Sequence, residues 1–227
     1  MKKTFAILNA VLIVAICFGN YAFITEGGIK IKAVTSGLFA LMGIVNLCYA
    51  LLTKEKQLKF PIFMSIGLIF AMLGDIVLGY NFIIGAALFA LGHVFYFICA
   101  SVLMKIRKFD LIFIGILFLC AGSFVLFCPL LSFDAPVMKY VCFIYALIIS
   151  FMTGKNIANC VKNPCPLMFI MAIGSVLFFF SDLMLVLDWF MDLSTGTLCM
   201  ATYYPAQFLL ASSVFVKETI GERKLKR

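Results

Sequence analysis

Histidine is nearly absent from this sequence, which has only His93 among its 227 residues. A catalytic zinc site usually takes two or three histidine ligands, so the composition argues against a zinc enzyme of the usual type. The nine cysteines form no Cys-x-x-Cys pair, and we interpret them as small hydrophobic residues, not as metal ligands. Ser-His-Asp catalysis would need His93 as its base, and no serine stands in a nucleophile-elbow motif. A phosphate-binding Gly-rich loop is missing too. These absences exclude most of the common catalytic arrangements.

Charged residues are also scarce, at 12% of the chain, whereas 65% of it is hydrophobic and the mean hydropathy is +1.16. A soluble domain cannot bury that much apolar surface, so lipid must be the solvent. A bilayer core takes about 20 apolar residues per helix, and helices satisfy their own backbone hydrogen bonds there. The sequence therefore predicts an all-α bundle of eight transmembrane helices in a single domain, residues 1–227. The predicted spans are about residues 5–24, 33–52, 60–79, 82–104, 110–131, 136–154, 166–187 and 197–216.

The net charge of +8 does not indicate a nucleic-acid partner, because the basic residues are sorted by position. When the connections are assigned alternately to two sides, all but Lys30, Lys32 and Lys139 of the 18 basic residues fall on the side of both termini. The positive-inside rule then places both termini in the cytoplasm of a plasma-membrane protein whose first span is retained. The expected partners are membrane lipids.

Two acidic residues lie well inside predicted spans, Asp75 in the third and Asp182 in the seventh. Charged groups in a span are costly, so they are usually paired or functional. Both lie about 6–8 Å below the outer boundary at 1.5 Å rise per residue. Their segments share a Pro, a Gly and the acid in the same order, and the two acids are 107 residues apart, which indicates a possible 4+4 parallel repeat. We expect the two carboxyl groups to meet close enough to share a proton.

Polar residues of the eighth span reach the same predicted depth. Tyr203 and Gln207 are four residues apart and share a helix face, with Tyr204 near that face. The alternatives are that the tyrosines belong to an interfacial belt and that Gln207 only joins helices.

The fourth and second spans add two more candidates. His93 shares a stripe with Ala86 and Ala90, so we expect it to face the bundle. Lys32 lies at the outer mouth of the second span. Here the alternatives are a hydrogen-bonded interior histidine and a plain interfacial lysine. Structural hydrogen bonding is likewise an alternative for both aspartates.

Four stretches resemble the YhhN-like lysoplasmalogenase family of eight-span membrane proteins: "GDIVL" from residue 74, "GAALFALGHVFYF" from residue 85, "GSVLFFFSDLML" from residue 174 and "TYYPAQFLL" from residue 202. One departure is that Lys32 precedes Ala33, where the family tends to have Lys-Pro. The resemblance implies cleavage of the vinyl ether bond of lysoplasmalogens to a fatty aldehyde and glycerophospho-ethanolamine or -choline. It leaves the headgroup, the chain preference and the oligomeric state open.

Vinyl ether hydrolysis suits the candidate residues. Protonation of the alkene gives an oxocarbenium ion that water captures, and two carboxyl groups in different environments can divide these roles, as in glycosidases. We assign Asp75 as the acid and Asp182 as the ionised partner, with no metal or cofactor. The supporting roles are water and glycerol binding by Tyr203, Tyr204 and Gln207, tuning of an aspartate by His93, and phosphate binding by Lys32. The competing hypotheses are a proton- or cation-coupled transporter, which also uses buried acids, and a non-catalytic lipid-binding protein.

Overall fold

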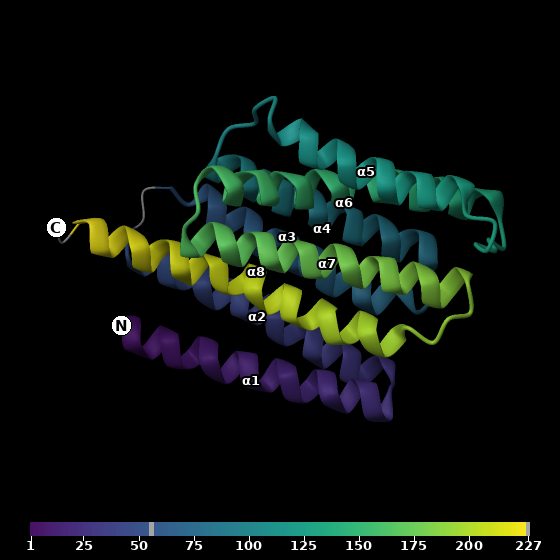
Figure 1. Cartoon of the computed structure of the whole chain (residues 1–227). Coiled ribbons are helices and arrows are strands. Elements are labelled where there is room, and N and C mark those ends of the chain that lie inside the picture. The colour runs from purple at the N-terminus through teal and green to yellow at the C-terminus, as the bar shows by residue number, and fades with distance from the viewer. Residues whose placement is uncertain (55–56, 226–227) are drawn as a thin grey trace.

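Eight long helices form the chain in the computed structural model, which describes residues 1–54 and 57–225, with side chains through residue 219. Their bounds are α1 Lys2–Glu26, α2 Ile29–Leu52, α3 Lys59–Leu78, α4 Phe82–Leu103, α5 Asp110–Phe127, α6 Pro136–Lys162, α7 Pro166–Phe190 and α8 Gly196–Leu225. The helices lie side by side in one bundle, and the described residues contain no strand (Figure 1). The predicted all-α membrane bundle is confirmed. Of the basic residues used to orient it, Lys56, Lys226, Arg227 and the side chains of Arg223 and Lys224 lie outside the described part.

Seven helices, α1 to α7, are long and apolar enough to cross a membrane, which makes the chain an integral membrane protein. The eighth helix has 30 residues and packs on α7 and α2 inside the same bundle, but it does not meet that criterion. Tyr203, Tyr204 and Gln207, three of the candidate site residues, lower the hydropathy of its first half.

Some helix ends differ from the predicted span ends. Helix α5 stops at Phe127, because Pro129 pushes Cys128 into an extended conformation with φ −71° and ψ 115°. Helix α6 continues to Lys162, well past residue 154, because its polar last turns are buried and find partners. Asn159 Nδ2, for example, donates to the carbonyl of Ala100 on α4 at 2.9 Å. Burial of polar side chains therefore extends this helix beyond its apolar run.

The start of α1 and the last turns of α8 lie at the same end of the bundle, here named the termini end (Figure 1). The opposite end, here named the distal end, carries the connections at residues 27–28, 79–81, 128–135 and 191–195. An even number of helices requires this arrangement. Which side of a membrane each end faces stays a prediction from the charge distribution.

The packing of the helices follows the predicted 4+4 relation. In the first half α1 packs on α2, α2 on α3 and α3 on α4, and in the second half α5, α6, α7 and α8 pack in the same order. The halves join through α2 with α8 and through α6 with α4, which are equivalent pairs. Two pairs break the relation. Helix α8 packs on α1 and on α3, whereas among the described residues α4 packs closely on neither α5 nor α7.

A charged pair is buried at the termini end. Lys155 Nζ lies 2.6 Å from Asp110 Oδ2, and the two side chains are 1% and 2% exposed. The same amine donates to the carbonyl of Lys105 at 3.1 Å. Lys155 is therefore an interior residue that joins α6 to the start of α5, although its place in the sequence suggested a basic surface residue.

Candidate functional site

The first carboxyl network is centred on Asp75, in the last turn of α3. Its Oδ2 accepts hydrogen bonds from Ser36 Oγ at 2.5 Å and from the hydroxyl of Tyr203 at 2.7 Å. Its Oδ1 lies 3.2 Å from Lys32 Nζ, and the Asp75 side chain is 2% exposed. Helices α2 and α8 supply these donors from opposite ends of the sequence. Two hydroxyl groups and one ammonium group thus face the Asp75 carboxyl group as hydrogen-bond donors.

The polar residues of α8 extend this network into the core. Gln207 Nε2 donates to the hydroxyl oxygen of Tyr203 at 3.0 Å, and Gln207 Oε1 accepts from the hydroxyl of Tyr96 at 2.9 Å. The hydroxyl of Tyr204 lies 3.3 Å from Ser36 Oγ. All of these side chains are buried. The structure thus brings Lys32, Tyr203, Tyr204 and Gln207 together around Asp75.

The second network is centred on Asp182, in the distal half of α7. The hydroxyl of Tyr145 on α6 donates to Asp182 Oδ2 at 2.7 Å. His93 Nε2 on α4 lies 3.2 Å from the same oxygen and 2.7 Å from the Tyr145 hydroxyl. His93 is fully buried, and its Nδ1 has no hydrogen-bond partner among the residues that the structure describes. His93 therefore faces the bundle, as its stripe of alanines predicted, and its bonded partners belong to the Asp182 network.

Aromatic side chains separate the two networks. The ring of Phe178 lies 5.3 Å from that of Tyr203 and 4.5 Å from that of His93, measured between centroids. Phe89 packs on Phe178 and Tyr203 as well. No hydrogen bond joins the two carboxyl groups, both of which are in the described part of the chain. The expected sharing of one proton between Asp75 and Asp182 is therefore not what the structure shows, because Phe89 and Phe178 lie between their partners.

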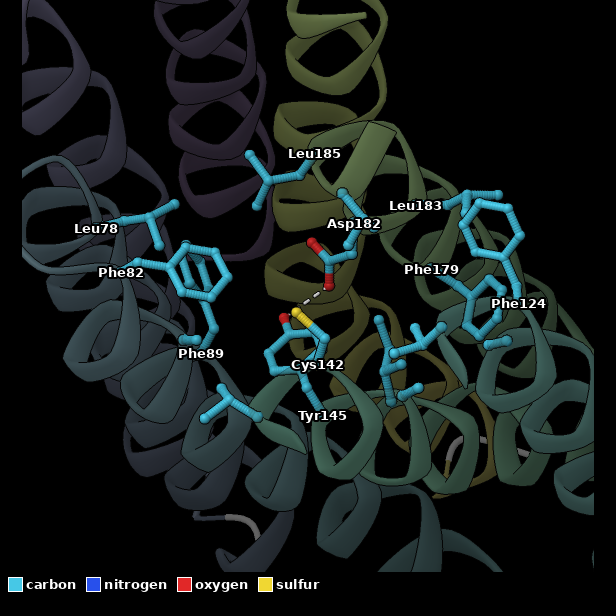
Figure 2. A pocket seen from close by; sticks show the side chains of 17 residues that line it. Leu78, Phe82, Phe89, Phe124, Cys142, Tyr145, Phe179, Asp182, Leu183 and Leu185 are labelled. Carbon is cyan, nitrogen blue, oxygen red and sulfur yellow. Dashed lines mark hydrogen bonds between the residues drawn. The ribbon is translucent and has the colours of Figure 1, made fainter. Parts of the chain in front are cut away.

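An apolar pocket opens beside the second network (Figure 2). Side chains of α4, α5, α6 and α7 line it, together with Leu78 at the end of α3. Asp182 is the only charged residue in its wall, and Figure 2 shows its carboxyl group hydrogen-bonded to Tyr145 among leucine and phenylalanine side chains. The space among these side chains, counted together with the part that is open to the surroundings, is about 750 Å³. The arrangement places one carboxyl group against a space suited to an apolar molecule.

Lysine contacts distinguish the two carboxyl groups. Lys32 and Lys139 are 107 residues apart, the same spacing as Asp75 and Asp182. Lys32 pairs with its aspartate, but Lys139 Nζ donates to the carbonyl of Leu126 at 2.9 Å. Within the described residues Asp182 has no lysine or arginine partner. The two halves therefore hold one ion-paired aspartate and one whose hydrogen-bond partners, within the described residues, are an imidazole and a phenol.

Two contributors were missed by the sequence analysis, Ser36 and Tyr145. Ser36 follows Lys32 by four residues and so shares its helix face, which was a usable signal. Tyr145 lies inside the sixth span, away from the ends where interfacial tyrosines gather, which was a second signal. Neither signal identifies the acid that the hydroxyl contacts, because that depends on which helices become neighbours.

The available functional groups are carboxyl, phenol, imidazole, amide and ammonium groups. The described residues contain no group of three or more His, Cys, Asp and Glu side chains that could hold a metal ion. These groups can transfer protons and form hydrogen bonds.

The sequence model of the YhhN family matches residues 35–214 of the chain. The matched segment contains both aspartates, His93, Tyr145 and the polar residues of α8, while Lys32 lies just before it. No curated protein and no solved structure matches the chain.

Proposed function

The chain belongs to the YhhN family, and from this membership and the geometry of its carboxyl networks we propose that it is a membrane-embedded hydrolase of lysoplasmalogens. The reaction cleaves the vinyl ether bond and yields a fatty aldehyde and a glycerophospho-ethanolamine or -choline. The observation that carries the proposal is the place of Asp182. It stands in the wall of an apolar pocket, hydrogen-bonded to a phenol, where an alkene carbon of a lipid chain can reach it.

The contacts favour Asp182 as the proton donor, which reverses the assignment made from the sequence. Asp75 accepts from two hydroxyl groups and pairs with Lys32, so its two oxygens are engaged and its negative charge is stabilised. Among the described residues Asp182 has no lysine or arginine partner, and it borders apolar space. Asp182 is therefore the carboxyl group that an alkene carbon in the pocket can reach, and we assign the proton transfer to it.

The reaction balances with one water molecule and one carboxyl group. Asp182 gives its proton to the alkene carbon that is not bonded to oxygen, and the electron pair of the double bond forms the new C–H bond. The ether oxygen shares its lone pair with the adjacent carbon, which makes an oxocarbenium ion. Water adds to that carbon and returns a proton to Asp182. The resulting hemiacetal collapses to the aldehyde and the glycerol hydroxyl.

Asp75 acts through its neighbours in this scheme and is a positioning residue. It holds Lys32 Nζ at the distal end of α2 and fixes the hydroxyl of Tyr203, whose ring packs against Phe178. The Lys32 side chain is 13% exposed and keeps N–H donors that Asp75 does not use. We assign those donors to the phosphate of the lysolipid, with Tyr203, Tyr204 and Gln207 available for water and the glycerol hydroxyl.

The test is incubation of the purified protein with a lysoplasmalogen and, separately, with the matching saturated-ether lysolipid, followed by measurement of free aldehyde. We expect aldehyde only from the vinyl ether, with and without a chelator, because only the alkene can be protonated. Equal release from both lipids, or none from the vinyl ether, would refute the proposal. Proton- or cation-coupled flux in proteoliposomes without aldehyde release would instead favour the transporter hypothesis.

The orientation of the chain in the membrane is part of the same proposal. Of the 18 basic residues, the distal end carries only Lys30, Lys32 and Lys139. The positive-inside rule therefore places this end outside the cytoplasm of a plasma-membrane protein. Both carboxyl networks lie in the distal half of the bundle. The headgroup of the lysolipid would then lie at the outer membrane surface.

A further inference from the structure

The helix packing leaves one side of the bundle unclosed. Helix α1 packs on α2 and also on α8, and Asn20 Nδ2 on α1 donates to the carbonyl of Met200 on α8 at 3.2 Å. In the second half, the contact equivalent to that of α1 with α8 would be packing of α5 on α4. In the described part of the chain, however, α5 packs closely on α6 alone. The space that α5 would close against α4 is where the pocket beside Asp182 lies.

The shape of the pocket follows from the residues in its wall. They fall within 82–89 on α4, 141–149 on α6 and 179–186 on α7, and α5 contributes from residue 121 to residue 125. At 1.5 Å per residue these stretches run about 10 Å along the helices from the distal end. Asp182 lies midway along the α7 stretch. The wall of the pocket therefore extends about 10 Å along the helices and has one carboxyl group partway along it.

We propose that this pocket binds the single aliphatic chain of a lysophospholipid, which enters from the bilayer between α4 and α5. A single chain in this space places its first carbons at Asp182 and Tyr145, and its headgroup points toward the distal end. Helix α5 is the wall that meets the bilayer: Leu119 on its outer side is 66% exposed, and among the described residues α5 packs closely on α6 alone. The ligand class rests on the proposed function, but binding of the chain does not require that the lipid be cleaved.

The experiment uses a saturated-ether lysophospholipid with a photoreactive diazirine on its chain and the full-length protein in nanodiscs. Illumination followed by mass spectrometry locates the adducts. We expect adducts on pocket residues such as Ala121, Phe124 and Ile149, and we expect excess unlabelled saturated-ether lysolipid to suppress them. Extra diacyl phospholipid in the nanodisc should not suppress them. Adducts spread over lipid-facing residues such as Val11 and Val34, with no suppression, would overturn the proposal, as would displacement by the diacyl lipid.

A pair of α5 variants tests the same site. Ala121 lines the pocket, whereas Leu119 is on the same helix and is 66% exposed. Ala121→Phe should lower the pocket adducts at least fivefold, because the new ring occupies the space of the chain. Leu119→Phe adds the same ring outside the pocket and should leave the adducts unchanged. Equal adduct yields in the two variants would overturn the proposal, and the adduct map of the unaltered protein decides the matter even if Ala121→Phe does not fold.

The outcomes separate this inference from the proposed function. Pocket adducts without aldehyde release from a lysoplasmalogen would leave the binding site standing and remove the hydrolase. Aldehyde release that Ala121→Phe does not change, together with scattered adducts, would leave the hydrolase standing and remove this binding site.

Discussion

The hydroxyl of Tyr145 lies 2.7 Å from Asp182 Oδ2 and 2.7 Å from His93 Nε2, so one phenol joins the carboxyl group to the imidazole. When the phenol donates to Asp182, its oxygen accepts from a protonated His93 Nε2. A change of proton position on one group then alters the hydrogen bonds of the other two. Because Tyr145 also lines the pocket, this coupling acts at the place where the proposed substrate would be protonated.

Replacement of this hydroxyl should slow the reaction without unfolding the protein. Tyr145→Phe keeps the ring and leaves Asp182 and His93 without their shared partner, so we expect kcat to fall about 10-fold or more with little change in KM. The pH profile of kcat should shift as well, since the proton position on Asp182 is no longer coupled through the phenol. Tyr140→Phe, on the exposed face of α6, is the matched control and should retain full activity. Equal rates in the two variants would remove Tyr145 from the mechanism.

The two aspartates should differ when each is replaced by asparagine. Asp182→Asn removes the proposed proton donor, so aldehyde release should fall at least about 100-fold while the protein elutes from size exclusion as before. Asp75→Asn should leave residual activity but destabilise the protein, because it leaves the Lys32 ammonium without its carboxylate. The exposed Asp192→Asn serves as control. An inactive Asp75 variant beside an active Asp182 variant would restore the assignment made from the sequence.

Lys32 should affect substrate binding more than the chemical step. Lys32→Gln removes the ammonium group proposed to face the phosphate, so we expect KM for a lysoplasmalogen to rise several-fold. Lys30→Gln is the matched control, because Lys30 lies two residues away on α2 and is exposed. A Michaelis–Menten comparison in nanodiscs measures both values. A fall in kcat at constant KM would show instead that Lys32 acts only by holding Asp75.

The sequence predicted the parts of this molecule that follow from one helix at a time. Hydropathy located the helices, and counting residues along α3 and α7 placed Asp75 and Asp182 in the same half of the bundle. The partners of these residues depend on which helix faces meet, and composition does not encode that. Lys32 and Lys139 illustrate this. Each precedes the aspartate of its own half by the same number of residues, but only Lys32 contacts its aspartate. The wrong expectation of a shared proton has the same origin, because the position of Phe178 between the networks is a tertiary feature.

Removing one residue of the buried pair at the termini end should strongly lower the stability of the protein, whereas replacing both residues together should lower it much less. Lys155→Met leaves the Asp110 carboxylate buried without its cation, which typically costs about 3–5 kcal/mol. The double variant Lys155→Met with Asp110→Asn removes both charges and should recover much of that loss. Thermal unfolding of the three proteins in one detergent measures the difference. A double variant less stable than Lys155→Met alone would show that Asp110 contributes mainly through its other contact, the hydrogen bond that it accepts from the Arg107 amide.

The last prediction concerns the close contact between α5 and α6. A Cβ atom at Gly154 of α6 would lie 2.6 Å from the backbone nitrogen of Ile114 and 2.7 Å from its Cα, so Gly154→Ala must push α5 away from α6. Because α5 packs closely on no other helix in the described structure, the displacement should lower the thermal unfolding temperature and loosen the wall of the pocket. Gly115→Ala, on α5 itself, meets no atom within 4 Å and should raise stability by about 0.5–1 kcal/mol through helix propensity. Melting curves of the two variants, each compared with the unaltered protein, test whether the first variant is less stable and the second more stable. If Gly154→Ala melted as high as Gly115→Ala, the close contact between α5 and α6 would not be what holds this helix in place.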